Sequence, residues 1–268
     1  MMRSDLSGKT VLVTGAGGAI GSSMAAVLGA NGAAVAVCDI VLANAEKTAA
    51  AIREAGGKAK AYYFDVTDPE CAARVADEIE NDFGGIDILI NNAGVNVGPN
   101  DRKPLHEFSP EKWEWILSID LDGVFKVTKA VVPHIIKRGG GSVINISSVV
   151  GQVPFRNQCA FTAAKAGVIN LSKAMALEFA PENIRVNVIC PGSIMFEGTK
   201  ALFYADKAKA EAMLSHIPQH RPGSPEDIAY AALYPDQEVL LFMILPIKMK
   251  YLAVADDGGW TCGFARDF

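Results

Sequence analysis

Short runs rich in β-branched residues alternate with longer, alanine-rich segments from residue 10 to about residue 190. Several of the short runs are apolar at nearly every position, as in strands that are covered on both faces. Strict alternation of this kind predicts right-handed crossovers and an α/β fold, a doubly wound parallel sheet in three layers. The expected strands are 10–14, 33–39, 59–65, 86–92, 141–148 and 184–190, and the expected helices are about 19–30, 42–55, 68–82, 110–137 and 161–180.

One domain is expected over residues 1–268, because α/β folds of about 250 residues commonly form a single unit and no linker or repeat interrupts the pattern. Half of the residues are hydrophobic, which supports a large core. The segment 191–225 is a long connection that carries Phe196 and Tyr204. Long insertions at the carboxyl edge of such a sheet tend to cover a ligand, so we interpret residues 191–225 as a lid with one or two short helices.

Charge and cysteine content narrow the function classes. The formal net charge is −5 and there is no long basic run, so nucleic acid is not an expected partner. The five cysteines are scattered without a CxxC pair or Cys/His cluster, which predicts no metal site and a reducing cytoplasm. The N-terminal residues form no apolar signal region, and the apolar run 239–247 is too short for a membrane helix. These features favour a cytoplasmic protein with a small-molecule ligand and no membrane partner.

The stretch TVLVTGAGGAIG places Gly15, Gly17, Gly18 and Gly21 between the first strand and the next helix. Glycines there let the backbone turn tightly and approach a pyrophosphate, whose charge meets the amides of the helix N-terminus. Asp39 ends the second strand, where a carboxylate accepts hydrogen bonds from ribose hydroxyls and repels a 2′-phosphate. No arginine or lysine lies in the glycine loop or directly after Asp39. The pattern predicts a Rossmann-type site for NAD rather than NADP; a plain glycine turn and a solvated strand-end acid are the alternatives.

Six short motifs follow one another along the chain: TGAGGAIG with Asp39, DV at 65–66, NNAG at 91–94, NISS at 145–148, FTAAK at 161–165 and PG at 191–192. Together they resemble the short-chain dehydrogenase/reductase (SDR) family over about residues 6–232. The resemblance implies reversible oxidation of a secondary alcohol to a ketone with a nicotinamide cofactor. It also implies cofactor contacts from Gly15, Gly17, Ala19, Ile20, Gly21, Asp39, Ile40, Asp65, Val66, Asn92, Ala93, Gly94, Lys165, Pro191, Gly192 and Ile194.

The resemblance covers the family's catalytic positions only in part. Ser148 matches the serine that bonds the substrate oxygen, and Lys165 matches the lysine that binds the nicotinamide ribose and favours the phenolate of a tyrosine. Phe161 stands where that tyrosine belongs, and the chain has no tyrosine between residues 64 and 203. Tyr204 of the lid is the one candidate to swing in. The resemblance therefore implies an active site without its proton donor, because a phenyl ring does no acid/base chemistry.

Asp120 is the fourth catalytic position and a second departure from the family. The family has asparagine there, in a helix whose backbone carbonyl holds a water of the proton relay. Aspartate supplies the same carbonyl, and its carboxylate near Lys165 alters the local charge; alternatively, it is a helix acid that pairs with water. Three function classes stay open: a dehydrogenase inactivated by an engineered or natural change at Phe161, a non-catalytic nucleotide-binding regulator, and an enzyme with another proton donor such as water.

Substrate contacts are expected from residues around this catalytic face and from the lid. Amides favour a polyol, a sugar or another polar alcohol, whereas the lid aromatics favour a steroid or cyclic alcohol. The expected contacts are Asn96, Gln152, Asn157, Phe196 and Tyr204.

The C-terminal region departs from the family over residues 235–252, through either a reading-frame error or divergence. The DGG at 257–259 matches the family's usual ending. The resemblance implies that the tail at about 251–268 supports a homotetramer and closes a neighbour's substrate site; a frayed terminus is the alternative.

Overall fold

The computed structural model of the chain describes residues 4–200, 204, 206–233 and 241–244, the last four by their backbone only. One parallel sheet of seven strands has the order β3-β2-β1-β4-β5-β6-β7. The strand order reverses between β1 and β4, which makes a switch point where ligands of such sheets bind. The strands are β1 (Thr10–Thr14), β2 (Ala34–Asp39), β3 (Lys58–Tyr63), β4 (Ile88–Asn91), β5 (Gly141–Ile146), β6 (Ile184–Pro191) and β7 (Leu241–Ile244).

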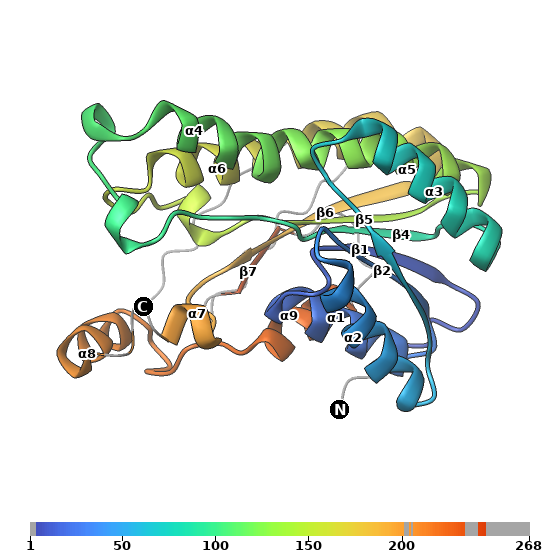
Figure 1. The fold of residues 1–268 in the computed structure, drawn as a ribbon, viewed down its shortest axis with the longest axis horizontal. Helices are drawn as coiled ribbons and strands as arrows, with labels where there is room; N and C mark the ends of the chain where they lie inside the picture. The colour runs from blue at the N-terminus through green and yellow to red at the C-terminus, as the bar shows by residue number, and fades with distance from the viewer. Residues whose placement is uncertain (1–3, 201–203, 205, 234–240, 245–268) are drawn as a thin grey trace, which may run out of the picture.

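Helices cover both faces of the sheet (Figure 1), which confirms the predicted α/β fold in three layers. They are α1 (Ala19–Ala30), α2 (Leu42–Glu54), α3 (Pro69–Phe83), α4 (Pro110–Leu117), α5 (Gly123–Lys137), α6 (Cys159–Phe179), α7 (Glu197–Thr199), α8 (Lys207–Ser215) and α9 (Pro225–Ala232). The short turns are η1 (Pro99–Asp101), η2 (Leu105–Glu107), η3 (Ser118–Asp122), η4 (Val149–Gly151) and η5 (Ala180–Glu182). Figure 1 shows α3 to α6 on one face of the sheet and α1, α2 and α9 on the other.

Each of the strands β1 to β6 contributes to two cores, because alternate side chains point to opposite faces of the sheet. Leu12 and Leu89 belong to the core that includes residues of α3, α5 and α6. Val13 and Ile90 belong to the core that includes Met24 of α1 and residues of α2 and α9. All five residues of β1 are buried. Packing of helices on both faces of the sheet holds the carboxyl ends of β1, β2 and β4 side by side.

The prediction of one helix over 110–137 is wrong in its middle. α4 ends at Leu117, η3 is a π-helical turn over Ser118–Asp122, and α5 begins at Gly123. Five residues are too few for a hydrophobic pattern to distinguish a π-turn from an α-turn. The other predicted elements begin and end within two residues of the observed ones.

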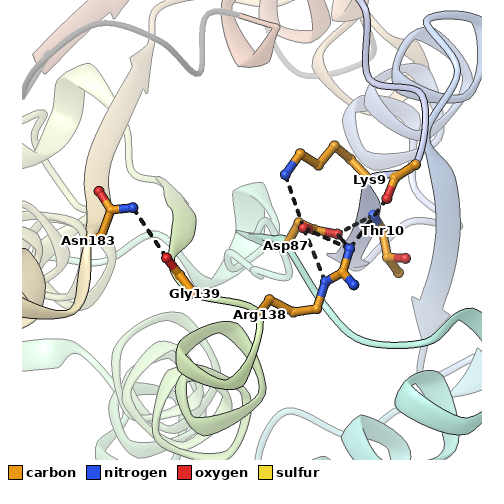
Figure 2. A network of polar contacts seen from close by, with 7 residues as sticks. Lys9, Thr10, Asp87, Arg138, Gly139 and Asn183 are labelled. Atoms are coloured by element: carbon orange, nitrogen blue, oxygen red, sulfur yellow. Dashed lines mark hydrogen bonds and ion pairs between the residues drawn. The ribbon is translucent and has the colours of Figure 1, made fainter.

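Asp87 ties the amino ends of β1 and β4 to the end of α5 (Figure 2). Its buried carboxylate accepts the Thr10 amide proton at 2.8 Å and lies 3.2 Å from Lys9 Nζ and 3.3 Å from Arg138 Nη2. A buried carboxylate is tolerated when partners satisfy both of its oxygens, as they do here. This network fixes the amino edge of the sheet, at the opposite ends of the strands from the glycine loop.

The described residues of the segment 191–225 include two short helices, α7 and α8, where the sequence predicts one or two. Its two ends meet, because Ile194 forms a parallel bridge with Gly223 and the Met195 amide donates to the Gly223 carbonyl at 2.8 Å. The segment therefore leaves the sheet after β6 and returns to the same place before α9.

β7 lies within the segment 235–252, whose sequence departs from the family. It pairs in parallel with β6, with Leu241 opposite Val188 and Ile244 opposite Pro191. The DGG at 257–259 and the expected oligomerisation tail at 251–268 lie outside the described residues. Among the helices that the structure describes, none is long and apolar enough to cross a bilayer.

Candidate active site

A cleft of about 780 Å³ opens where β1, β2 and β4 end. Pockets of roughly 300–1,000 Å³ hold most small-molecule ligands and cofactors. Residues from loops that are far apart in the sequence line this cleft, and most of the residues expected to contact the cofactor are among them. These are Gly15, Ala19, Ile20, Gly21, Asp39, Ile40, Asp65, Val66, Asn92, Ala93 and Gly94.

The glycine loop is packed too closely for side chains. Gly15 has φ +62°, and a Cβ there would lie 2.9 Å from Ala93 Cα. A Cβ on Gly21 would lie 2.2 Å from the Gly15 carbonyl oxygen. Asn92 Nδ2 donates to the carbonyl oxygens of Thr14 at 2.9 Å and of Gly15 at 3.1 Å. The loop is thus held rigidly at the N-terminus of α1, where backbone amides can meet a pyrophosphate.

Asp39 lies at the edge of the cleft with both carboxylate oxygens oriented by backbone amides. Oδ2 accepts the Gly17 amide proton at 2.9 Å, and Oδ1 accepts the Val41 amide proton at 2.9 Å. A Cβ on Gly17 would lie 2.5 Å from Asn44 Cβ and 2.9 Å from Asp39 Oδ2. Gly17 therefore positions Asp39. The fixed carboxylate suits a ribose diol and disfavours a 2′-phosphate.

Asp65 and Val66 form another part of the cleft wall, after β3. Asp65 Oδ1 accepts the Thr67 amide proton at 2.8 Å and the Thr67 hydroxyl proton at 2.7 Å. Val66 packs on the start of α5, where a Cβ on Gly123 would lie 2.9 Å from Val66 Cγ2. This wall combines an oriented carboxylate with an apolar surface.

The side chains of Phe161 and Lys165 lie on one face of α6, as their spacing predicts, with Lys165 Nζ 5.6 Å from the centroid of the Phe161 ring. Lys165 is buried, and its Nζ donates to the Ile146 carbonyl at 3.1 Å. Ser148 Oγ accepts the Val150 amide proton at 3.2 Å where η4 begins, and η4 packs against α6. Because Ser148 accepts there, its own proton can be donated to a ligand oxygen. This face offers a hydroxyl, an amine and a phenyl ring.

Asp120 is 0% exposed and contacts Lys165 directly. Its Oδ1 accepts the Val95 amide proton at 2.7 Å, and its Oδ2 lies 3.0 Å from Lys165 Nζ. Burial raises the pKa of Asp120, and the charge of Lys165 and the Val95 hydrogen bond oppose that rise. The alternative that Asp120 pairs with water is wrong, because its carboxylate contacts protein groups on both sides.

The remaining residues expected to contact the cofactor do not line the cleft. Pro191 is the last residue of β6. Ile194 is buried in the core that faces α1, since its apolar side chain packs beneath the bridge to Gly223. The residues outside the lining are Gly17, Lys165, Pro191, Gly192 and Ile194.

The amides expected to contact substrate have different surroundings. Asn96 Nδ2 donates to Gln158 Oε1 at 2.9 Å, and Asn96 Oδ1 accepts the Val97 amide proton at 2.8 Å. Asn96 therefore shapes the loop after β4. Gln152 and Asn157 are exposed on the loop between Ser148 and α6, and Asn157 has φ 61°, a left-handed conformation that asparagine tolerates.

The two lid aromatics also lie in different places. Phe196 lines the cofactor cleft together with the glycine loop. The Tyr204 hydroxyl lies 2.6 Å from Ser193 Oγ, so its phenol is engaged by the first residues of the segment 191–225. Neither the position of Phe196 nor that of Tyr204 follows from sequence spacing alone.

Other residues line the cleft without any signal in the motifs. Three of them come from α4 and η3, the region where the sequence predicts an uninterrupted helix. Spacing within a helix cannot show which side faces a cleft when the helix contains a π-turn. These additional residues are Phe64, Thr67, Val95, Trp115, Ser118 and Ile119; Gly18 of the glycine loop also lines the cleft.

Residues 9–207 match the protein family described as short chain dehydrogenase. The chain belongs to the short-chain dehydrogenase family. Members of this family are oxidoreductases that act on alcohols and ketones with nicotinamide cofactors. Among the described residues, no group of three or more His, Cys, Asp or Glu side chains is placed to hold a metal ion.

Relatives within the family include proteins with different substrates. A 3-oxoacyl-[acyl-carrier-protein] reductase FabG of Thermotoga maritima is 38% identical over 229 residues, which cover 85% of this chain and 90% of the relative. A 3beta-hydroxysteroid dehydrogenase 1 of Eggerthella lenta is 40% identical over 236 residues, covering 87% and 88%. The crystal structure of an NAD+-bound xylitol dehydrogenase has a TM-score of 0.85 at 30% identity, covering 91% of this chain and 100% of that one.

Proposed function

We propose that this short-chain dehydrogenase uses NAD to interconvert a secondary alcohol and its ketone, and that Phe161 removes most of its turnover. The oriented carboxylate of Asp39 carries the proposal for NAD, because Oδ1 and Oδ2 each accept a backbone amide proton at 2.9 Å. A 2′-phosphate beside this carboxylate would meet like charge without a nearby cation from the glycine loop. The structurally similar xylitol dehydrogenase is NAD+-bound, which agrees with this choice.

The residues that line the cleft and the adjoining face formed by Ser148, Phe161 and Lys165 have different roles in the proposed reaction. NAD, when bound, supplies the hydride chemistry. Asp39 holds the adenosine ribose, the amides after Gly15 meet the pyrophosphate, and Lys165 holds the nicotinamide ribose. Ser148 donates a hydrogen bond to the substrate oxygen and so positions the reacting carbon. Phe161 preserves the shape of the site, but its ring has no proton to give or accept.

A polar secondary alcohol such as a polyol or sugar is the first substrate class. Gln152 and Asn157 support it, because both are exposed on the loop that follows Ser148. The second class is a steroid or other cyclic alcohol, which exposed apolar side chains on the same loop, Val153 and Phe155, would contact. Xylitol and 3beta-hydroxysteroid appear in the names of similar proteins, one for each class.

A non-catalytic nucleotide-binding protein is the second candidate function. Phe161 favours it, because most of the residues expected to contact the cofactor line the cleft while the position of the proton donor is apolar. Water as an alternative proton donor would keep slow turnover instead. The expected lid over residues 191–225 and the expected homotetramer are compatible with both candidate functions. Exposed Phe125 and Leu177 support an assembly through α5 and α6.

Asp39→Ser should weaken NADH binding by about tenfold or more, since charge-assisted hydrogen bonds contribute roughly 1.5–3 kcal/mol each. NADPH binding should not fall in parallel, because the like charge is removed together with the ribose acceptor. Quenching of protein fluorescence by each dinucleotide measures both affinities. Glu54→Ser is the matched control, because it removes an exposed carboxylate from the same part of the chain, outside the cleft. Equal NADH affinity in Asp39→Ser and Glu54→Ser would exclude the proposed role of Asp39.

A further inference from the structure

Two departures from the family's catalytic pattern meet at one amine. Phe161 contacts Lys165 from the same helix, with Nζ 5.6 Å from the ring centroid. Asp120 contacts Lys165 from η3, with Oδ2 3.0 Å from Nζ. Phe161 is an apolar residue at the position of the family's tyrosine. Asp120 is an acid at the position of the family's asparagine. Asp120 places a carboxylate beside the amine, and Phe161 removes the group that the amine would help to ionise.

The Asp120–Lys165 pair is enclosed. The two side chains are 0% and 6% exposed, so solvent screens their attraction weakly. Gly94 lies against the pair, because a Cβ there would lie 3.1 Å from Asp120 Oδ2 and 3.2 Å from Lys165 Nζ. The other oxygen of Asp120 is held by the Val95 amide, so the carboxylate is fixed toward the amine. The π-turn of η3 is the local structure that places Asp120 there.

Other polar groups around Lys165 do not replace this partner. Cys190 of β6 faces Lys165, and burial raises the pKa of its thiol to about 11, so the thiol is neutral at pH 7. The Ile146 carbonyl accepts from Nζ without carrying charge. Among the described elements packed around the amine, Asp120 of η3 and Cys190 of β6 are the titratable neighbours, and Asp120 supplies the negative charge.

We propose that Asp120 is a positioning residue that neutralises Lys165, so that the amine anchors the cofactor ribose but no longer favours an ionised group at position 161. This inference rests on the proposed function. In an ion pair at 3.0 Å, the field of the ammonium at a third group is largely cancelled by the carboxylate beside it. A site of this kind tolerates phenylalanine at 161 and gives a phenol there little help to ionise.

The test places a phenol at 161 and measures its pKa with and without the charge of Asp120. In Phe161→Tyr, the phenol should titrate near its ordinary value of about 10. In the double variant Phe161→Tyr with Asp120→Asn, its pKa should fall by at least about one unit, which is a tenfold change in the phenolate ratio. The ultraviolet spectrum of each variant is compared with that of the matching protein that keeps Phe161. The difference isolates the added phenol from the six native tyrosines.

Asp122→Asn is the matched control, since Asp122 is an exposed carboxylate in the same π-turn. Adding it to Phe161→Tyr should leave the pKa of the phenol unchanged. A second variant, Asp120→Ala, removes the charge without offering Lys165 a new donor and should shift the phenol in the same direction. Thermal unfolding identifies any variant that is not folded.

Several results would overturn the inference. In Phe161→Tyr alone, a phenol pKa below about 8 would mean that Lys165 keeps its full effect despite Asp120. An equal pKa with and without Asp120→Asn would mean that the carboxylate does not neutralise the amine. These titrations need no turnover. If the double variant shows the expected fall in phenol pKa while folded Phe161→Tyr reacts with no alcohol or ketone, the proposed function would be removed and the charge pairing would stay supported.

Discussion

Phe161→Tyr should raise the rate of NADH-dependent ketone reduction by about 100- to 10,000-fold, the contribution of a positioned general acid. The new ring is nearly isosteric with the old one, so the packing of α6 is expected to stay as it is. The added hydroxyl would extend from the ring that lies 5.6 Å from Lys165 Nζ. Reduction is the direction to measure, because the neutral phenol is the form that donates a proton and it predominates at pH 7.

The decline in absorbance of NADH across a panel of polyol-derived, sugar-derived and cyclic ketones measures this gain. Phe125→Tyr is the matched control, because Phe125 is 51% exposed on α5, and a phenol there should not change the rate. If the folded Phe161→Tyr variant binds NADH but reduces none of these ketones, the result would favour the non-catalytic nucleotide-binding protein. If the unaltered chain reduces the ketones as fast as Phe161→Tyr does, the result would instead favour water as the proton donor.

Gly17→Ala should weaken NADH binding by about 100-fold, because each 1.4 kcal/mol lost is a factor of ten and the substitution disturbs several contacts together. The new methyl group would lie 2.5 Å from Asn44 Cβ and 2.9 Å from Asp39 Oδ2. These distances are too short for real contacts, so the loop or the carboxylate must move. Movement breaks the hydrogen bond between the Gly17 amide and Asp39, which orients the ribose acceptor.

Fluorescence titration with NADH compares Gly17→Ala with Gly98→Ala, its matched control. Gly98 has φ −65°, and a Cβ there would have no atom within 4 Å, so alanine should be accommodated. Both variants should keep the cooperative unfolding of the parent protein. Unchanged NADH affinity in Gly17→Ala would show that the glycine loop does not bind the dinucleotide in the proposed way.

The alternation of strand-like and helix-like sequence patterns made the fold and most of the cofactor cleft predictable. Strand and helix alternation predicts a parallel sheet, and the carboxyl ends of its central strands must then meet at one edge. Gly15 directly follows the first strand and Asp39 ends the second, so their meeting in one cleft follows from topology. Phe161 and Lys165 share a helix face for a similarly local reason, their spacing of one turn.

Contacts between distant side chains were not predictable in this way. The hydrogen bond between Asn96 and Gln158 joins residues 62 positions apart, and no local pattern encodes it. The ion pair of Asp120 with Lys165 depends on a π-turn that has no hydrophobic signature over five residues. The position of Phe196 in the cofactor cleft depends on how a long connection folds back on the sheet. Such contacts arise from packing that becomes defined only when the elements are assembled.

Isothermal titration calorimetry of the unaltered chain with NADH and NADPH tests the central claim, that this cleft binds an unphosphorylated dinucleotide although the catalytic phenol is absent. NADH should bind at least about tenfold more tightly than NADPH, because Asp39 accepts from a free ribose and repels a phosphate. Tighter binding of NADPH, or no heat with either dinucleotide from folded protein, would contradict the account.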